Sequence, residues 1–297
     1  MSKPSPLPEP AFLGEVPELT AGEFREISRM AYEYAGLDLG DNKTQLVMAR
    51  LGKKLRQLQI PSFSEYCRHV KEDRTGEALI GMIDALTTNH TSFLREQAHF
   101  DFLAREVLPP LTGRTSLSIW SAACSTGEEP YSIVFTALDA LGADGSRKLS
   151  VLATDISTKA LAMAARAIYP MDRMQGMSQE WLSRFLMRGK GRFEGQCQVK
   201  PQVRELVDFR RQNLMESFAH LGPFQVIFCR NVMIYFDRET QQDLVNRLAG
   251  RLEPGGYLLT GHSESLNGLD QPLRYVKPAI YRKSETEGGT VSHRGRV

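Results

Sequence analysis

Residues 117–130 read LSIWSAACSTGEEP, an apolar run followed by a turn of small residues and two glutamates. Leu117–Ala122 is typical of a short buried strand, and a helix is expected to begin at Glu128 or Pro130. The same strand–turn–helix order recurs downstream, which predicts an α/β fold with a mostly parallel sheet and helices on both faces. Ligands of such sheets bind beyond the carboxyl ends of the strands, where the strand order reverses.

The remaining elements are expected along the rest of the chain. Strands are expected at Leu149–Thr154, Val203–Phe209, Phe224–Cys229, Gly256–Thr260 and Leu273–Tyr281, and helices at Gln97–Val107, Ser157–Ala167 and Arg238–Leu252. A further helix is expected to end near Arg188, followed by the glycine-rich residues 188–201, RGKGRFEGQCQVKP. This composition predicts a small β-hairpin insertion at about 189–202, with a plain surface loop as the alternative.

The loop after the first strand does not suit a phosphate. It contains one glycine, Gly127, instead of the three of a dinucleotide-binding fingerprint, and it lacks the Gly-Lys-Ser/Thr ending of a P-loop. Glu128 and Glu129 at the helix start would repel a phosphate group. The turn therefore favours a ligand with a cationic or amino group.

Polar side chains follow the other expected strands at the same edge. Asp155 is placed to accept hydrogen bonds from both ribose hydroxyls of a nucleoside, although an Asp after a strand is often only a helix cap. Asn231 and Tyr235 lie where a substrate and a reacting group would meet, and Asn213-Leu214 could clamp an adenine. Each residue alone is equally compatible with an ordinary capping asparagine or core tyrosine.

The N-terminal third differs from the α/β part. Residues 1–17 hold five of the 15 prolines, and both this segment and residues 284–297 are expected to be disordered. Residues 18–88 are expected to form an all-α module that opens with a capping box at Thr20 and Glu23. Residues 89–114 are expected to be a linker and connecting helix, and residues 115–283 the α/β domain. The linker is rich in hydroxyls and amides ahead of Arg95, although a plain interdomain connection is the alternative.

Composition excludes several classes of protein. Of the 297 residues, 41% are hydrophobic and 24% charged, which is typical of a soluble protein with a real core. A net charge of +2 argues against coating nucleic acid or an anionic membrane through bulk charge. The N-terminus has no signal-peptide pattern, and no apolar run reaches the ~18–20 residues that span a bilayer. The scattered cysteines and histidines show no metal-ligand spacing, so we expect a reduced, cytoplasmic protein without a metal.

One helix of the all-α module carries a basic face. Residues 42–64 contain five Lys/Arg and no Asp or Glu. The basic residues are Lys43, Arg50, Lys53, Lys54 and Arg56, and the apolar stripe on the opposite face is Val47, Leu51, Leu55 and Leu58. Such a face is normally only a solvated surface, but it would also attract a carboxylate-rich protein or a nucleic acid.

Together these motifs resemble the CheR-type chemotaxis receptor methyltransferases, which transfer a methyl group from S-adenosylmethionine to glutamate side chains of bacterial chemoreceptors. The matching stretches, between Thr87 and Leu266, are TTNHTSFLRE, WSAACSTGEEPYS, ATDIS, RRQNL, IFCRNVMIYF and EPGGYLLTGHSESL. One departure is Phe93-Leu94, where the family usually has two phenylalanines. The resemblance implies a Rossmann-like methyltransferase domain, an N-terminal all-α domain and a small antiparallel β-subdomain.

The resemblance also implies roles for individual residues. The implied cofactor is S-adenosylmethionine, with S-adenosylhomocysteine as product and no metal. The implied contacts are Asn89, Thr91 and Arg95 from the linker, Glu128 (with Glu129 the weaker candidate) at the aminoacyl end, Asp155 at the ribose, and Asn213, Leu214, Asn231 and Val232 around the adenine and methionyl parts. Arg95 is the candidate that orients the incoming carboxylate, and Tyr235 the candidate that contacts the methyl region.

The implied partner is the cytoplasmic helical region of methyl-accepting chemoreceptors, docked on the basic face. In some family members the β-subdomain also binds a short peptide at the receptor's C-terminal end. We expect a cytoplasmic monomer with no nucleic-acid partner and no membrane insertion.

Three other functions fit the sequence less well. A nucleic-acid base methyltransferase would use the same basic face, but residues 231–235, NVMIY, lack the prolines typical of amino-group methylases. A non-enzymatic cofactor sensor would not need both Arg95 and Tyr235. A serine hydrolase is weaker still, because Ser125 lies in no nucleophile-elbow context.

Overall fold

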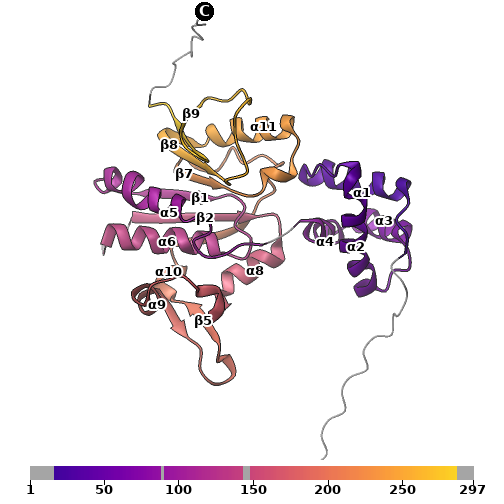
Figure 1. The fold of residues 1–297 in the computed structure, drawn as a ribbon, viewed down its shortest axis with the longest axis horizontal. Helices are drawn as coiled ribbons and strands as arrows, with labels where there is room; N and C mark the ends of the chain where they lie inside the picture. The colour runs from indigo at the N-terminus through magenta and orange to yellow at the C-terminus, as the bar shows by residue number, and fades with distance from the viewer. Residues whose placement is uncertain (1–16, 88–89, 143–147, 286–297) are drawn as a thin grey trace, which may run out of the picture. The chain divides into compact units, whose positions relative to one another are not determined.

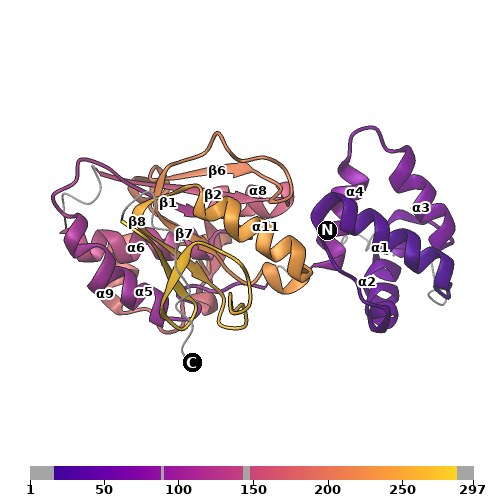
Figure 2. The same ribbon diagram turned by 90° about the horizontal axis from the view of Figure 1, so that it is seen from above.

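The computed structural model describes residues 17–87, 90–142 and 148–285 (Figure 1, Figure 2). Contacts divide the chain into two units, one up to residue 88 and the other from residue 89. Nearly all of the two segments expected to be disordered, residues 1–17 and 284–297, lies outside the described residues, and so does Asn89.

The first unit is built from helices. They are α1 (Ala21–Ala35), α2 (Thr44–Leu58), α3 (Phe63–Glu72) and α4 (Glu77–Leu86), with a 3-10 turn at Asp41–Lys43 before α2. The capping box is confirmed, because Thr20 Oγ1 accepts the Glu23 amide at 3.3 Å and Glu23 Oε2 accepts the Thr20 amide at 2.9 Å. The buried stripes of these helices meet in one core, formed by Phe24, Ile27, Val47, Leu51, Leu55, Phe63, Tyr66, Met82 and Ile83.

The expected burial of Leu58 is wrong, since its side chain is 42% exposed. Leu58 is the last residue of α2, and Gln59 turns the chain away with a φ of 58°. The apolar stripe of α2 therefore ends one turn earlier, at Leu55.

The second unit is centred on a seven-stranded sheet with the order β6-β2-β1-β7-β8-β10-β9. Its strands are β1 (Leu117–Ser121), β2 (Leu149–Asp155), β6 (Val207–Arg211), β7 (Phe224–Cys229), β8 (Leu252–Thr260), β9 (Leu273–Lys277) and β10 (Ile280–Lys283). The pairs β1–β2, β1–β7, β2–β6 and β7–β8 are parallel, so the expected α/β fold is confirmed. The single strand expected at Leu273–Tyr281 is instead an antiparallel hairpin, in which β10 lies next to β8.

Successive residues of β1 point to opposite faces of the sheet, and each face has its own core. Ser121 faces helix α6 (Glu128–Leu141), where its hydroxyl donates to Glu129. Trp120 packs on the other face against Phe218 and Phe224. Helix α5 (Ala98–Phe102) packs against α6, and helix α11 (Arg238–Ala249) packs on β8. A π-helical turn, Leu103–Val107, continues α5.

The β insertion is larger than expected and starts earlier. A three-stranded antiparallel sheet with the order β3-β5-β4 is formed by β3 (Ile168–Pro170), β4 (Leu186–Arg188) and β5 (Gln196–Val199), below the large sheet in Figure 1. Helix α9 (Gln179–Phe185) therefore ends three residues before Arg188, because β4 begins at Leu186. The strand expected from Val203 begins only at Val207, after the short helix α10 (Pro201–Arg204). We refer to β3, β4 and β5 as the β-subdomain.

We predict that Phe135→Ala lowers the free energy of unfolding of the second unit by about 3–5 kcal/mol, the usual cost of a large cavity in a core. The Phe135 ring is fully buried and stacks on the Phe185 ring at 4.8 Å between centroids. Denaturant unfolding followed by tryptophan fluorescence measures this, because both tryptophans, Trp120 and Trp181, lie in the second unit. Tyr275→Ala, at a side chain that is 62% exposed, serves as control. An unchanged Phe135→Ala midpoint would contradict the packing.

Candidate functional site

The predicted ligand-binding residues gather at one edge of the large sheet. Strand β1 has β2 on one side and β7 on the other, so the strand order reverses at β1. The loops that follow β1, β2, β6 and β7 all begin at the carboxyl ends of parallel strands. This edge is the position at which α/β sheets bind their ligands.

The turn after β1 depends on Gly127. Its φ of 97° is one that other residues rarely adopt, and a Cβ there would lie 2.7 Å from the Cβ of Ala164 and 2.8 Å from Tyr169 Oη. Tyr169 Oη also donates to the Thr126 carbonyl at 2.8 Å. The turn is therefore packed closely against α8 (Thr158–Arg166) and against strand β3 of the β-subdomain.

Asp155 links two of the loops. Its Oδ2 accepts the Ser125 amide at 2.8 Å, and its Oδ1 accepts the Ser157 amide at 2.9 Å. The N-cap of α8 is Ser157, whose hydroxyl accepts the Ala160 amide, so a plain helix-capping role for Asp155 is wrong. The carboxylate is held rigidly between the loops after β1 and β2.

The two adjacent glutamates have different partners. Both oxygens of Glu129 are engaged inside the protein, by Ser121 Oγ at 2.7 Å and by Arg230 Nη1 at 2.9 Å. Glu128 accepts from Thr126 Oγ1 at 2.6 Å and from Arg173 Nη1 at 2.5 Å. The Arg173 side chain is 48% exposed whereas Glu128 is buried, so a cationic group of a ligand can take the place of Arg173 and keep the carboxylate paired. This difference favours Glu128 over Glu129 as a ligand contact.

Arg230 is a residue of the site that the sequence did not predict. It follows β7, its side chain is buried, and besides Glu129 it binds Glu96 Oε2 at 2.9 Å and the Arg95 carbonyl at 2.5 Å. The sequence did hold a signal, because an arginine directly after the fully buried run of β7 needs buried partners. Arg230 therefore ties the linker, α6 and the loop after β7 together.

The linker is an ordered part of the site. Leu94 and Glu96, on either side of Arg95, have φ values of 55° and 58°. The Leu94 amide donates to Ser132 Oγ on α6 at 3.0 Å, and Arg95 Nη1 donates to the His90 carbonyl at 2.8 Å. Because residues other than glycine adopt positive φ at a cost, such contacts are needed to hold this conformation. Residues 90–96 are therefore more than a plain connection between domains, because they make specific contacts with the α/β unit. Thr91, within this segment, is half-buried.

The predicted residues after β6 and β7 lie in two tight turns. Asn213 and Leu214 are buried, with Asn213 Oδ1 accepting the Met215 amide at 3.0 Å. Asn231 has a φ of 59°, and its Nδ2 lies 3.4 Å from Glu96 Oε1. Tyr235 ends a 3-10 turn, Met233–Tyr235, and like Val232 it is half-buried.

Glu96, His99 and His262 lie together, with ligand atoms within 4.8 Å of one another. Sequence spacing did not reveal this cluster. Burial lowers the pKa of His99 to about 4, helped by the charge of Arg230. The Arg230 guanidinium already binds the Glu96 carboxylate, and its positive charge disfavours a metal ion beside it.

The basic face of α2 is smaller than expected. Lys53 and Arg56 are exposed, but Arg50 donates to the Leu86 carbonyl at the end of α4. Lys43 donates to the Asp38 carbonyl at 3.1 Å, and Lys54 lies over Gly81 of α4. Lys53 and Arg56 are therefore the residues of the basic face that are most accessible to a binding partner.

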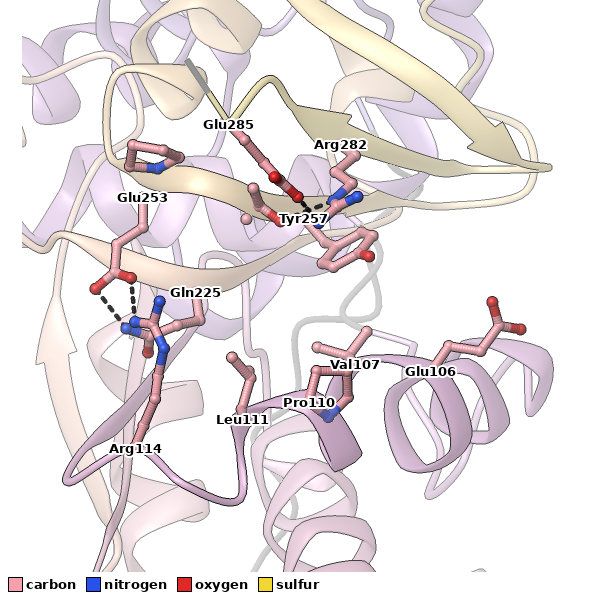
Figure 3. A pocket seen from close by; sticks show the side chains of 13 residues that line it. Glu106, Val107, Pro110, Leu111, Arg114, Gln225, Glu253, Tyr257, Arg282 and Glu285 are labelled. Atoms are coloured by element: carbon pink, nitrogen blue, oxygen red, sulfur yellow. Dashed lines mark hydrogen bonds and ion pairs between the residues drawn. The ribbon is translucent and has the colours of Figure 1, made fainter. Parts of the chain in front are cut away.

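A cavity of about 360 Å³ lies at the opposite edge of the sheet, near the starts of β7 and β8 (Figure 3). Its charged side chains are paired with one another or with neighbours, as Arg114–Glu253, Arg282–Glu285 and Glu106–Lys277. These pairs lower the affinity that it could offer a charged ligand. In the described ranges, no helix has the length and apolar character needed to cross a membrane.

We predict that Arg230→Met lowers the free energy of unfolding by about 3–5 kcal/mol, because it leaves the buried carboxylates of Glu96 and Glu129 without their cation. Adding Glu129→Gln should recover part of this loss. Arg210→Met is the control and should cost no more than about 1 kcal/mol, since Arg210 pairs with Asp208 at the surface, where the two side chains are 59% and 50% exposed. Denaturant unfolding measures all three, and equal effects of Arg230→Met and Arg210→Met would contradict the prediction.

The ion pair between Arg230 and Glu96 makes the stability of the protein depend on pH. Burial raises the pKa of Glu96, but the hydrogen bond and charge of Arg230 outweigh this and lower it overall. A lowered folded-state pKa adds stability above the unfolded value of about 4.3, and this stability is lost as pH falls through the folded value. We expect Glu96→Gln to reduce the loss of stability below about pH 4.3. Unfolding midpoints between pH 7 and pH 3 measure this, and parallel curves for variant and wild type would contradict it.

Comparison with known proteins identifies the family of the chain. The family model "CheR methyltransferase, SAM binding domain" matches residues 89–281, and "CheR methyltransferase, all-alpha domain" matches residues 22–87. Chemotaxis protein methyltransferase 2 of Pseudomonas aeruginosa is 39% identical over 94% of this chain and 99% of its own length. The chemotaxis protein methyltransferases of Salmonella typhimurium and Escherichia coli are 39% and 38% identical, each over 90% of this chain and 92% of their own. The chain belongs to the CheR methyltransferase family.

Proposed function

We propose that this protein transfers the methyl group of S-adenosylmethionine to glutamate side chains of bacterial chemoreceptors, forming glutamyl methyl esters in chemotactic adaptation. Membership of the CheR family over both units carries the proposal. The chemistry of the site supports it, because Glu128 and Asp155 lie at the ligand-binding edge and disfavour a phosphate.

The residues at this edge fit S-adenosylmethionine, which supplies a methyl group activated by a positively charged sulfur. Glu128 would bind the ammonium group and Asp155 the ribose hydroxyls. Asn213, Leu214, Asn231 and Val232 would surround the adenine and the methionyl part, with Asn89 and Thr91 closing over them from the linker. No metal is required for this binding.

The receptor glutamate needs no general base, because its carboxylate is ionised at pH 7. Its oxygen attacks the methyl carbon in line with the sulfur, so that the O–C bond forms as the C–S bond breaks. Arg95 orients this carboxylate, and Tyr235 contacts the methyl region. The protein therefore acts mainly by alignment and exclusion of water.

Docking of the receptor uses other surfaces. The exposed Lys53 and Arg56 of the basic face would attract a receptor helix that carries several glutamates. An edge strand of the β-subdomain, β3 or β4, would accept an extended peptide from the receptor's C-terminal end. We propose that the enzyme works in the cytoplasm as a monomer and inserts no segment into the membrane.

One experiment separates this function from nucleic-acid methylation. The protein is incubated with methyl-labelled S-adenosylmethionine and either chemoreceptor-containing membranes or nucleic acid, and the product is then treated with alkali. Label released as methanol from receptor protein supports a glutamyl methyl ester. Label retained on nucleic acid, or no transfer to either, would overturn the proposal.

We predict that Arg95→Ala lowers kcat about 100-fold or more, the effect of misaligning reacting groups, with cofactor affinity changed less than about threefold. Asp155→Ala should mainly weaken cofactor binding, by about tenfold or more, because a buried carboxylate that accepts hydrogen bonds is lost. Steady-state kinetics and calorimetric titration with S-adenosylhomocysteine measure the two effects. Equal losses of kcat with unchanged affinity in both variants would contradict this division of roles.

We predict that the double variant Lys53→Ala, Arg56→Ala raises KM for the receptor about five- to thirtyfold, from about 1–2 kcal/mol of lost surface attraction. Cofactor affinity should not change, and the difference from wild type should shrink at high salt. The control, Arg105→Ala with Arg274→Ala, removes two exposed positive charges from the other unit. Identical KM values in the two double variants would show that the basic face is only a solvated surface.

A further inference from the structure

Glu264 is a buried carboxylate, 6% exposed, in the loop that follows β8. Three backbone amides donate to it. Oε2 accepts from Gly261 N at 2.6 Å and from Asn231 N at 2.7 Å, and Oε1 accepts from Ile234 N at 3.2 Å. Among the described residues, no lysine, arginine or histidine forms an ion pair with Glu264. Burial raises the pKa of this carboxyl, and the three amides oppose that shift by stabilising the ionised form.

Two of the donated amides belong to the loop after β7, which carries the predicted contacts with cofactor and methyl group. Asn231 and Ile234 bracket Val232, and Tyr235 directly follows Ile234. The left-handed conformation of Asn231 is unfavourable by itself and needs a partner that holds it. Glu264 supplies that partner at the Asn231 amide.

Hydrogen bonds of its own main chain hold Glu264 in place. Its amide donates to the Gly261 carbonyl at 2.8 Å, and its carbonyl accepts from Thr260 Oγ1 at 2.9 Å. Thr260 pairs with Cys229 in the parallel register of β8 and β7, so the ends of the two strands are adjacent. A Cβ at position 261 would lie 2.5 Å from Asn231 Nδ2, which shows how closely the two loops pack.

Helix α11 holds the opposite side of the loop that follows β7. Gln241 Nε2 donates to the carbonyls of Met233 at 3.0 Å and Phe236 at 2.9 Å. The loop after β7 therefore gives its amides to Glu264 and its carbonyls to Gln241. The 3-10 turn that ends at Tyr235 is fixed from both sides.

We infer that Glu264 is a positioning residue for methyl transfer, which acts through the main chain of Asn231 and Ile234 to set the place of Val232 and Tyr235. The inference rests on the proposed function for the role of Tyr235. The anchoring itself rests only on the hydrogen bonds of Glu264. A small displacement of an aligned group is enough to slow a reaction of this kind.

The test compares Glu264→Gln with Glu253→Gln. Both glutamates belong to the β8 region, but Glu253 lies at the start of the strand, where it binds the side chains of Gln225 and Arg114. The glutamine at position 264 keeps the size of the side chain but replaces one of the two accepting oxygens by an NH2 group, which cannot accept a hydrogen bond from an amide. We expect kcat to fall about tenfold or more in Glu264→Gln, with KM for the receptor within about threefold of wild type. Glu253→Gln should keep the wild-type kcat within about twofold.

Amide hydrogen exchange gives a readout that a general loss of stability would not mimic. In the wild type we expect the amides of Asn231 and Ile234 to exchange slowly, and Glu264→Gln should speed their exchange about tenfold or more relative to the β7 amides. Fast wild-type exchange at both positions would overturn the inference even if the variant does not fold. Unchanged kcat, or equal exchange in the two variants, would overturn it as well. A wild type that methylates no receptor would instead overturn the proposed function.

Discussion

The buried guanidinium of Arg230 is the interaction on which the site depends. It is bound by Glu129 of α6, by Glu96 of the linker and by the Arg95 carbonyl, and it directly precedes Asn231. Breaking such a network is costly, but an apolar replacement of the whole network would often be neutral for stability. Its value therefore lies in geometry, because it brings three chain segments that are distant in sequence into one arrangement at the carboxyl edge of the sheet.

The fold was predictable wherever local pattern decides the structure. The buried strand before Ala122, the capping box at Thr20 and the parallel order of the central strands all follow from short-range signals. The β9–β10 hairpin did not, because the expected strand turns back on itself and its two halves pair with each other. The early start of the β-subdomain at Ile168 did not either, because Ile168 pairs with Gln198, which is distant in sequence. Short apolar runs such as residues 273–281 fit one strand or two equally well until their partners are known.

The residues of the candidate site also fall into those that were predictable from the sequence and those that were not. Glu128, Asp155, Asn213 and Asn231 were predicted because each follows a predicted strand, and parallel strands place such residues at one edge. Arg230 and Glu264 were missed, since each has a partner distant in sequence that no spacing rule connects to it. Asn231 is 33 residues from Glu264, and Arg95 is 135 residues from Arg230. The basic face was overestimated because helical periodicity places Arg50 outward, whereas the end of α4 offers it a carbonyl.

The contact between Tyr169 and Gly127 has a consequence for the modularity of the fold. Tyr169 belongs to β3 of the β-subdomain, yet its hydroxyl packs against the turn after β1 and donates to Thr126. An insertion joined only through its two chain connections could be exchanged between proteins or deleted without harm. This one supplies part of the wall behind the turn after β1, so a transplanted or deleted β-subdomain would require a redesigned turn. The insertion and the sheet that carries it are constrained to evolve as a pair.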